Sequence, residues 1–247
     1  MPGEAIPFNY RYFAEQAARF GSRTLDYGCG VGEMIALGRA NGLDIWGADT
    51  FEGFYSGLAD ALKPAAKDRI VRIVGQRAEF PDQHFDLVVS NQVLEHVRDP
   101  ERAIADIFRL LRPGGLFIAA FPVVGTWYEG HVGLYFAHRL RPKSRLRRAY
   151  FELSHRLGFG LYRGDMTTAQ WIDFAENCLD QECFYYPVSR IRRALENTFD
   201  SDVEDVSADY MRARLGDRRR AVPRFSDPLL RVAYHVRAGQ ILRVRKR

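Results

Sequence analysis

A glycine-rich segment near the N-terminus constrains the fold of this chain more than any other feature. Residues 25–33 read LDYGCGVGE, in which an apolar lead-in ends at Asp26 and glycines then alternate up to a helix-like stretch, Glu33–Ala40. Glycine admits backbone angles closed to other residues and lets a ligand lie against the main chain. The segment predicts a strand, a tight turn and a helix start that hold a nucleotide-like molecule, with an ordinary strand–helix turn as the alternative.

The spacing within this loop argues against a dinucleotide. A dinucleotide fold needs a third glycine three residues after Gly30, and that position holds Glu33. A carboxylate there would repel a diphosphate at the helix N-terminus. A ligand without phosphate and with a cationic centre meets no such repulsion.

The pattern D-x-G-x-G-x-G resembles the signature loop of class I S-adenosylmethionine-dependent methyltransferases. The resemblance implies that Asp26 lies near the methionine amino group of the cofactor. It also implies that the loop backbone borders the cofactor at Gly28, Cys29, Gly30 and Gly32.

A second acid follows at a matching distance. The short apolar stretch Leu43–Asp49 reads as a strand, and Asp49 lies 21 residues after Gly28. This is the spacing at which an acid at a strand end binds a ribose diol, and one carboxylate can accept from two hydroxyls. We expect Asp49 and the adjacent Thr50 at the cofactor. The alternative is an Asp that caps a helix starting near Glu52.

The stretch from Gly75 to Val97 resembles the type 11 small-molecule branch of these methyltransferases, in which a loop after strand three lines the adenine. This chain has Gln76 where the family usually has an acid. The amide carbonyl of a glutamine still accepts from the adenine amino group. The resemblance places further residues near the cofactor, with Arg77 and Ala78 contributing backbone only: Arg77, Ala78, Asn91, Gln92 and His96. His96 is also readable as a structural hydrogen-bonding residue.

The segment after residue 98 completes the resemblance. Asp99 and Pro100 mark a helix start, the helix ends in the turn LRPGG, and Leu116–Phe121 reads as strand five. Residues 23–121 thus follow the family pattern in order. The implied fold is a Rossmann-like three-layer α/β sandwich with a seven-stranded, mostly parallel sheet and an antiparallel last strand.

The rest of the chain is assigned by the same resemblance. We expect a helix at Ser189–Phe199, strand six at Val203–Ser207, strand seven at Gln240–Arg245 and an N-terminal helix at Phe8–Phe20. The stretch Val123–Pro187 is too long for a plain loop, so we interpret it as a mostly helical cap, inserted after strand five, that forms the acceptor pocket. The expected parts are an N-terminal helical segment, the cofactor-binding core, the cap and the C-terminal part of the core: 1–22, 23–122, 123–187 and 188–247.

The start of the cap combines aromatic residues with two histidines. Histidine titrates near neutral pH and is a common general base. We take His131 as the candidate base and His138 as the second candidate. A structural or pocket-lining role is the alternative for both. Two histidines at this spacing do not make a metal site, and we expect none.

Composition limits the partners. The chain has 247 residues, a formal charge of +5, three cysteines and no apolar run of membrane-spanning length. The residues at the N-terminus, Met1–Glu4, show no secretory signal, and a reduced, cytoplasmic setting is expected. Basic residues cluster in three stretches: Arg139–Arg148, Arg212–Arg220 and Arg243–Arg247.

These clusters read as solvated helix faces or as a surface for anionic partners. The stretch Pro228–Arg237 has an apolar face with basic neighbours, so it suits either packing on the sheet or contact with the inner face of a membrane. No aromatic–basic module typical of RNA binding is present, which makes nucleic acid an unfavoured partner.

Three classes of function follow. The leading hypothesis is an O-methyltransferase acting on a small-molecule, sugar or lipid-linked glycan acceptor, with S-adenosylmethionine as cofactor and S-adenosylhomocysteine as product. The alternatives are N- or C-methylation of another small molecule, or an inactive methyltransferase-like binding subunit. Glu33 and the LRPGG turn argue against a nicotinamide dehydrogenase. The sequence does not define the oligomeric state.

Overall fold

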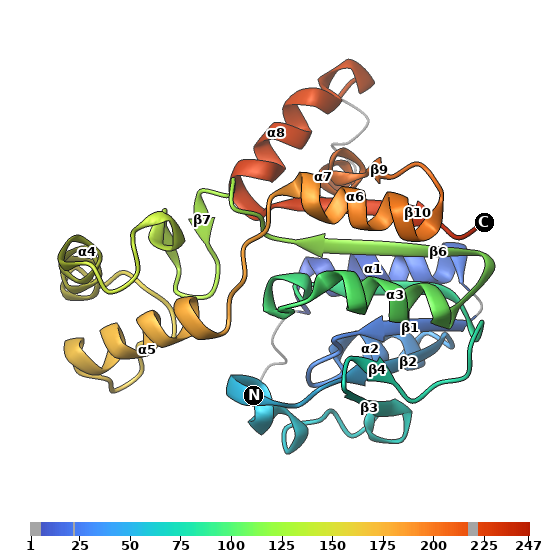
Figure 1. The fold of residues 1–247 in the computed structure, drawn as a ribbon, viewed down its shortest axis with the longest axis horizontal. Coiled ribbons are helices and arrows are strands. Elements are labelled where there is room, and N and C mark those ends of the chain that lie inside the picture. The colour runs from blue at the N-terminus through green and yellow to red at the C-terminus, as the bar shows by residue number, and fades with distance from the viewer. Residues whose placement is uncertain (1–5, 22, 217–221) are drawn as a thin grey trace.

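The structure, a computed structural model, describes residues 6–21, 23–216 and 222–247. In this part of the chain, eight strands form one sheet in the order β4-β3-β2-β1-β5-β6-β10-β9, with helices on both faces (Figure 1). The strands of this sheet are β1 (Arg23–Tyr27), β2 (Asp44–Asp49), β3 (Ile70–Val74), β4 (Arg77–Ala78), β5 (Phe85–Asn91), β6 (Leu111–Phe121), β9 (Glu204–Asp205) and β10 (Gln240–Arg245).

Strand directions confirm the predicted mixed sheet. The five central strands β3, β2, β1, β5 and β6 run parallel, and β10 pairs antiparallel with β6 from Gln240–Phe121 to Arg245–Leu116. The predicted number of seven strands is wrong. The additional strand β4 pairs antiparallel with β3 at one edge, through Ile73–Ala78 and Val74–Arg77.

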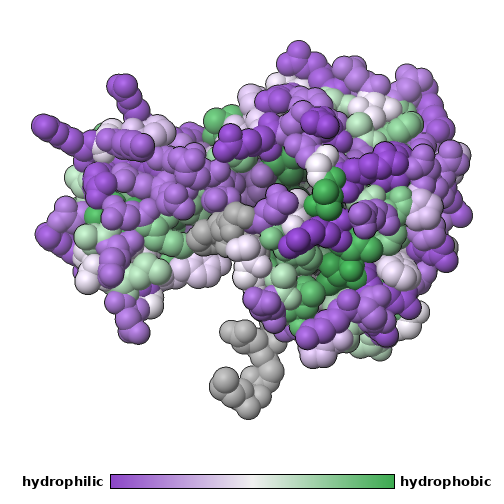
Figure 2. All heavy atoms as spheres, turned by 60° about the horizontal axis from the view of Figure 1, so that its bottom comes forward, coloured by the Kyte–Doolittle hydropathy of each residue, from purple (hydrophilic) through white to green (hydrophobic). Residues whose placement is uncertain are grey.

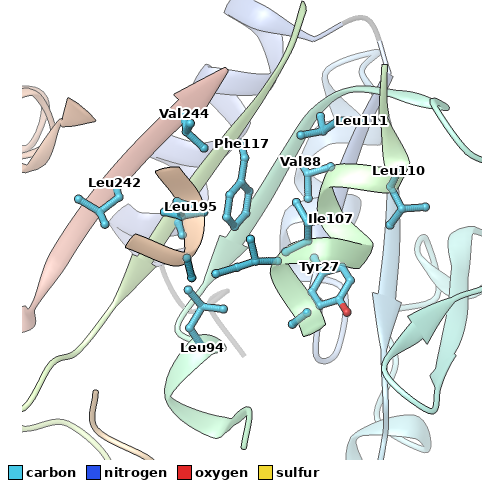
Figure 3. Packing of buried hydrophobic residues seen from close by; sticks show 14 of the residues in the cluster. Tyr27, Val88, Leu94, Ile107, Leu110, Leu111, Phe117, Leu195, Leu242 and Val244 are labelled. Carbon is cyan, nitrogen blue, oxygen red and sulfur yellow. The ribbon is translucent and has the colours of Figure 1, made fainter. Parts of the chain in front are cut away.

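Alternating side chains along β6 show why helices cover both faces. Phe117 and Ala119 belong to one buried apolar cluster, whereas Ile118 and Ala120 belong to another on the opposite face. Successive residues of a strand point to opposite faces, so a strand buried on both sides reads as a continuous apolar run. Figure 3 shows the first cluster, in which Phe117 packs near side chains from neighbouring strands and helices.

The predicted helices of the core, at 8–20, at 33–40, after Asp99 and at 189–199, are confirmed, and a further helix at Ser207–Arg214 was not predicted. The helices that flank the sheet are α1 (Phe8–Phe20), α2 (Glu33–Ala40), α3 (Pro100–Leu110), α6 (Val188–Phe199), α7 (Ser207–Arg214) and α8 (Asp227–Ala238). The start of α3 follows the expected capping chemistry, because the Asp99 carboxylate accepts a hydrogen bond from the backbone N–H of Arg102 at 3.2 Å. Pro100 occupies the first turn, where a missing N–H costs nothing.

Two strand boundaries differ from the prediction. Strand β6 starts at Leu111 rather than at Leu116, because Leu111 already pairs with Phe85 before an irregularity that contains the LRPGG turn. Strand β9 has only two residues, since α7 begins at Ser207.

The segment between β6 and α6 has a small core of its own. It contains the hairpin β7 (Tyr128–Glu129) and β8 (Leu134–Tyr135) and the helices α4 (Arg145–Arg156) and α5 (Thr168–Gln181). Phe151 and Trp171, both fully buried, belong to its apolar cluster. Figure 1 places α4 and α5 beyond the end at which β6 finishes, and Figure 2 shows this segment as a separate lobe with a largely hydrophilic surface.

Two expectations extend beyond the described residues. The prediction about Met1–Glu4 and part of the Arg212–Arg220 cluster fall on positions that the structure does not describe. Within the described part, no helix combines the length and the apolar character needed to cross a membrane.

Candidate active site

The glycine loop joins β1 to α2, and two of its glycines are required by packing. Gly28 has φ of +84°, and a Cβ there would lie 2.2 Å from a methyl carbon of Val93. Gly32 has φ of +83°, and a Cβ there would lie 2.5 Å from Ala66. A Cβ at Gly30 would meet only Leu58, at 3.7 Å. The side of the loop next to Gly30 is therefore the open one, where a ligand can approach the backbone.

Two carboxylates stand at this loop. The side chain of Asp26, in β1, is buried. Burial raises the pKa of its carboxyl to about 7, and the charge of Asp49 adds to this shift. Asp49 accepts hydrogen bonds from the backbone N–H of Gly30 at 2.8 Å and of Phe51 at 3.1 Å. These hydrogen bonds connect Asp49 to the glycine loop, and its side chain does not cap the next helix. A cationic ligand beside Asp26 would stabilise the ionised carboxylate.

The predicted adenine-side residues separate into two groups. Gln76 has φ of +64°, and its Oε1 atom is buried without a hydrogen-bond partner among the described residues. A buried acceptor of this kind is costly unless a ligand or water donates to it. Arg77, in contrast, lies at the surface, 3.6 Å from Asp82. Ala78 is buried, and its N–H donates to Asp106 at 2.9 Å, so this group is already engaged.

Two further predicted cofactor residues, Cys29 and Thr50, lie in the glycine loop and directly after β2, whereas His96 lies in a separate polar cluster with His131. Cys29 is buried in the loop, and Thr50 is exposed after β2. Tyr10 of α1 was not among the predicted site residues. Burial raises the pKa of Tyr10 to about 12, and the nearby charges of Asp26 and Glu33 add to this effect. The long α1 helix pattern gave no indication that this residue faces the glycine loop.

A cavity of about 650 Å³ opens where β5 and β6 end. Asn91 and Gln92 line it from β5 and the loop that follows, and Ala120 lines it from β6. The insertion, predicted to form the acceptor pocket, contributes a single lining residue, Tyr128. The other walls come from α1, α7 and α8, and they include Asn9, Phe13, Tyr210, Met211, Arg214, Ala233, Tyr234, Arg237 and Ala238.

The two predicted catalytic histidines lie in the insertion, and His131 belongs to a buried polar cluster. His131 Nδ1 lies 2.6 Å from Oε1 of Glu129, an oxygen that also accepts from the Tyr185 hydroxyl at 2.5 Å. His131 Nε2 lies 3.1 Å from Nε2 of His96, whose Nδ1 donates to the backbone carbonyl of Glu182 at 2.6 Å. Both ring nitrogens of His131 are thus engaged with protein groups, and its role as a base stays a prediction.

The pKa values of the residues in this cluster are shifted in different directions. Burial by itself lowers the pKa of His131, but the hydrogen bond to Glu129 and its charge outweigh burial and raise that pKa to about 9. Burial lowers the pKa of His96 to about 4, and the charge of His131 adds to this effect. Burial raises the pKa of the Glu95 carboxyl to about 8, although His131 opposes the shift. A single proton is therefore held between the two imidazoles near neutral pH.

His138 lies beside this cluster without joining its hydrogen bonds. Its ring centroid is 4.6 Å from that of Tyr185, and neither ring nitrogen has a hydrogen-bond partner among the described residues. Burial lowers the pKa of His138, although the charge of Glu129 opposes the shift. The catalytic role of His138 also stays a prediction.

Comparison with known proteins identifies a methyltransferase domain. Residues 25–119 match a protein-family model described as a methyltransferase domain, which covers the glycine loop, Asp49, Gln76 and β5. A solved S-adenosylmethionine-dependent methyltransferase from Mesorhizobium loti superposes with a TM-score of 0.56, at 17% identity over 97% of this chain and 98% of that one. Residues 25–119 are therefore a methyltransferase domain, and the whole chain has the fold of an S-adenosylmethionine-dependent methyltransferase.

Among curated methyltransferases, a ubiquinone biosynthesis O-methyltransferase from Coxiella burnetii is 26% identical over 215 residues, or 83% of this chain and 82% of that protein. The enzyme of the same name from Escherichia coli is 30% identical over 142 residues. That match spans 56% of this chain and 59% of the Escherichia coli protein.

The site of this methyltransferase fits S-adenosylmethionine, the cofactor of the family. The glycine loop offers open backbone at Gly30, and Asp26 and Asp49 supply negative charge toward a cationic ligand. The unpartnered Oε1 of Gln76 supplies an acceptor for an amino group. Which individual residues touch the cofactor stays a prediction.

Proposed function

We propose that this methyltransferase transfers a methyl group from S-adenosylmethionine to an oxygen atom of a small-molecule acceptor, such as a sugar or a lipid-linked glycan. The observation that carries the proposal is the buried Asp26 carboxylate next to Asp49 at the open side of the glycine loop. Two matched relatives carry the name of an O-methyltransferase, which supports oxygen as the accepting atom.

The chain's own residues would bind and orient the reactants. Asp26 would hold the methionine ammonium group, Asp49 the ribose hydroxyls, and Gln76 the adenine amino group. The cofactor supplies a methyl group already activated by the sulfonium charge. The protein's contribution is then to place the acceptor oxygen in line with that methyl group and to keep water away.

The cavity beyond β5 and β6 is the proposed acceptor site. Tyr128 and Tyr234 present aromatic surface, and the Arg237 guanidinium lies 3.8 Å from the centre of the Tyr128 ring. Aromatic walls with cationic groups at the rim suit sugar-containing or amphiphilic acceptors. His131 and His138, the predicted bases, do not line this cavity, so a proton acceptor at the methylated oxygen is not part of the proposal.

The distribution of arginines makes nucleic acid an unfavoured partner. Within the described residues, members of all three predicted clusters pair with acids inside the protein: Arg148 with Glu176, Arg212 with Asp227 and Arg243 with Glu204. Charges neutralised in this way contribute little to phosphate binding.

Peripheral membrane contact and a cytoplasmic setting stay predictions. Exposed Leu229 and Val232 on α8 support the membrane contact.

A methyl-transfer screen tests the proposed function. The full chain is incubated with methyl-labelled S-adenosylmethionine and with sugars, lipid-linked glycans, phenols or transfer RNA, and the labelled product is analysed by NMR. A methyl ether that fails to form with the Asp49→Ala variant supports the proposal. A methylated nitrogen or carbon contradicts the oxygen assignment. Tight S-adenosylhomocysteine binding without any transfer favours the inactive binding subunit.

A further inference from the structure

Three metal-ligating side chains converge outside the cofactor site. His96 comes from the short 3₁₀ helix η3 (Leu94–His96) of the core, His131 from the loop between β7 and β8, and Cys183 from the segment after α5. Their ligand atoms all lie within 4.8 Å of one another, and the two histidine Nε2 atoms are 3.1 Å apart. Two nitrogens on one tetrahedral zinc ion are separated by roughly 3.3 Å, given Zn–N bonds of about 2.0–2.1 Å.

A hydrogen bond at Nδ1 fixes the orientation of each imidazole ring. Nδ1 of His96 donates to the Glu182 carbonyl, and Nδ1 of His131 donates to the Glu129 carboxylate. With each Nδ1 carrying its hydrogen, loss of the proton between the rings leaves two Nε2 lone pairs that face the same point. Histidines that bind metals are held in this manner by a carboxylate or backbone carbonyl on the far nitrogen.

Buried carboxyl groups lie close to the same point. Glu95 is 1% exposed, and neither of its carboxylate oxygens has a hydrogen-bond partner among the described residues. Buried polar atoms without a partner are costly unless a bound group satisfies them.

We propose that His96, His131 and Cys183 bind one soft divalent transition-metal ion of the zinc class. Imidazole nitrogens with a thiolate sulfur suit zinc, whereas magnesium and calcium require oxygen ligands. Binding displaces the proton shared by the two imidazoles and the thiol proton of Cys183, and the three protein donors leave one position of a tetrahedral ion open. The ion would tie the insertion to the core.

This inference goes beyond the proposed function and holds whatever the acceptor is. It also departs from the prediction of no metal site, which weighed only His131 with His138. The true neighbours of His131 are 35 residues earlier and 52 residues later in the chain, so local spacing gave no signal.

Cobalt provides the direct test, because Co²⁺ occupies zinc sites and reports its ligands by absorption. The full chain, stripped with a chelator, is titrated first with Co²⁺ and then with Zn²⁺ in competition. We expect one ion per chain, a thiolate-to-cobalt band in the near ultraviolet and the visible bands of tetrahedral cobalt. Cys183→Ser removes the thiolate band, and Glu129→Gln, which loosens the His131 ring, weakens binding about 10- to 100-fold.

Matched variants and a second ligand keep the outcome decisive. His84→Gln changes a histidine away from the cluster and should leave the cobalt spectrum unchanged. Circular dichroism confirms that each variant is folded. Absence of stoichiometric binding, or a spectrum unaffected by Cys183→Ser and His131→Gln, overturns the inference. S-adenosylhomocysteine binding is measured on the same samples, so a protein that binds this ligand but no metal contradicts the metal site alone.

Discussion

The glycine loop and the polar cluster of the insertion are two sites built in different ways. The loop places Asp26, Gly28 and Gly32 within seven consecutive residues and uses its backbone as the binding surface. The cluster brings the side chain of His96, on the core, to that of His131, on the insertion, from positions 35 residues apart in the chain. A binding site formed by consecutive backbone groups can be predicted from a short sequence pattern. A site formed by side chains that are distant in sequence can be recognised only in the structure.

The two regions also differ in what stabilises them. The core is held by the ladder of eight strands and by apolar clusters on both faces. The insertion has a smaller apolar cluster, and a buried ion pair joins α4 to α5, between Arg147 Nη1 and Asp180 Oδ1 at 2.7 Å. The guanidinium of Arg147 is only 1% exposed. Substitutions that act on one region and spare the other therefore test how independent they are.

The largest effect is expected from Asp180→Asn. The change leaves the buried Arg147 cation without its partner and should lower the free energy of unfolding of the insertion by about 3–5 kcal/mol. Urea denaturation followed by tryptophan fluorescence measures this, since Trp171 is in the same core. Asp173→Asn, which affects an exposed pair with Arg148, should cost less than about 1 kcal/mol. If Asp180→Asn also abolishes S-adenosylhomocysteine binding, the two regions are coupled.

Gly28→Ala should follow, because the new Cβ combines a positive φ with a close approach to Val93. We expect a destabilisation of about 2–4 kcal/mol together with loss of S-adenosylhomocysteine binding in calorimetry. Gly160→Ala creates a similar contact with Trp171, at 2.4 Å, in the insertion. It should destabilise comparably and keep the ligand. Gly42→Ala, with nothing within 4 Å, serves as the control for φ alone.

A pH dependence of cofactor binding is expected from Asp26. Its pKa of about 7 in the ligand-free protein means that the carboxyl is neutral below pH 7 and ionised above it. S-adenosylmethionine carries cationic groups, so its affinity should fall about tenfold per pH unit below 7 and level off above 8. Asp26→Asn should flatten this profile and weaken binding by about 1.5–3 kcal/mol. A wild-type profile that is flat from pH 5.5 to 8 would remove Asp26 from the site.

The smallest effect is expected at Gln76. Gln76→Met keeps the side-chain length but removes the unpartnered acceptor, and should weaken S-adenosylhomocysteine binding by about 0.5–1.5 kcal/mol. Gln83→Met is the matched control, because Gln83 also has a positive φ but lies exposed. Calorimetry that shows equal affinities for Gln76→Met and the wild type would argue against adenine recognition by this residue.

Strands and helices of the core were predictable because their signals are local. Asp99 with Pro100 starts α3, and an uninterrupted apolar run becomes a β6 buried on both faces. The eighth strand was missed because the two residues of β4, Arg77 and Ala78, are too few to show an alternating pattern. The cavity was missed for another reason. Its walls join α1 to α7 and α8, which are close only after the chain has folded.

The chemistry of the histidines could not be predicted from the sequence either. His131 was chosen for its residue type and its place after β6, and both remain sound reasons for interest. Its pKa and its freedom to react depend on Glu129, which is close in sequence, but also on His96, Tyr185 and Cys183. Long-range neighbours of this kind decide the chemistry of a titratable group, and no local pattern reports them.

The insertion leaves the chain at the end of β6 and returns at the start of α6, and it buries its own Phe151 and Trp171. No strand of the large sheet is interrupted by it. Exchange of residues 123–187 for the corresponding segment of another methyltransferase therefore leaves every sheet pairing in place. The architecture therefore separates variation in this lobe from the pairing of the strands, and a replacement lobe has to supply only the contacts that reach the core through His96.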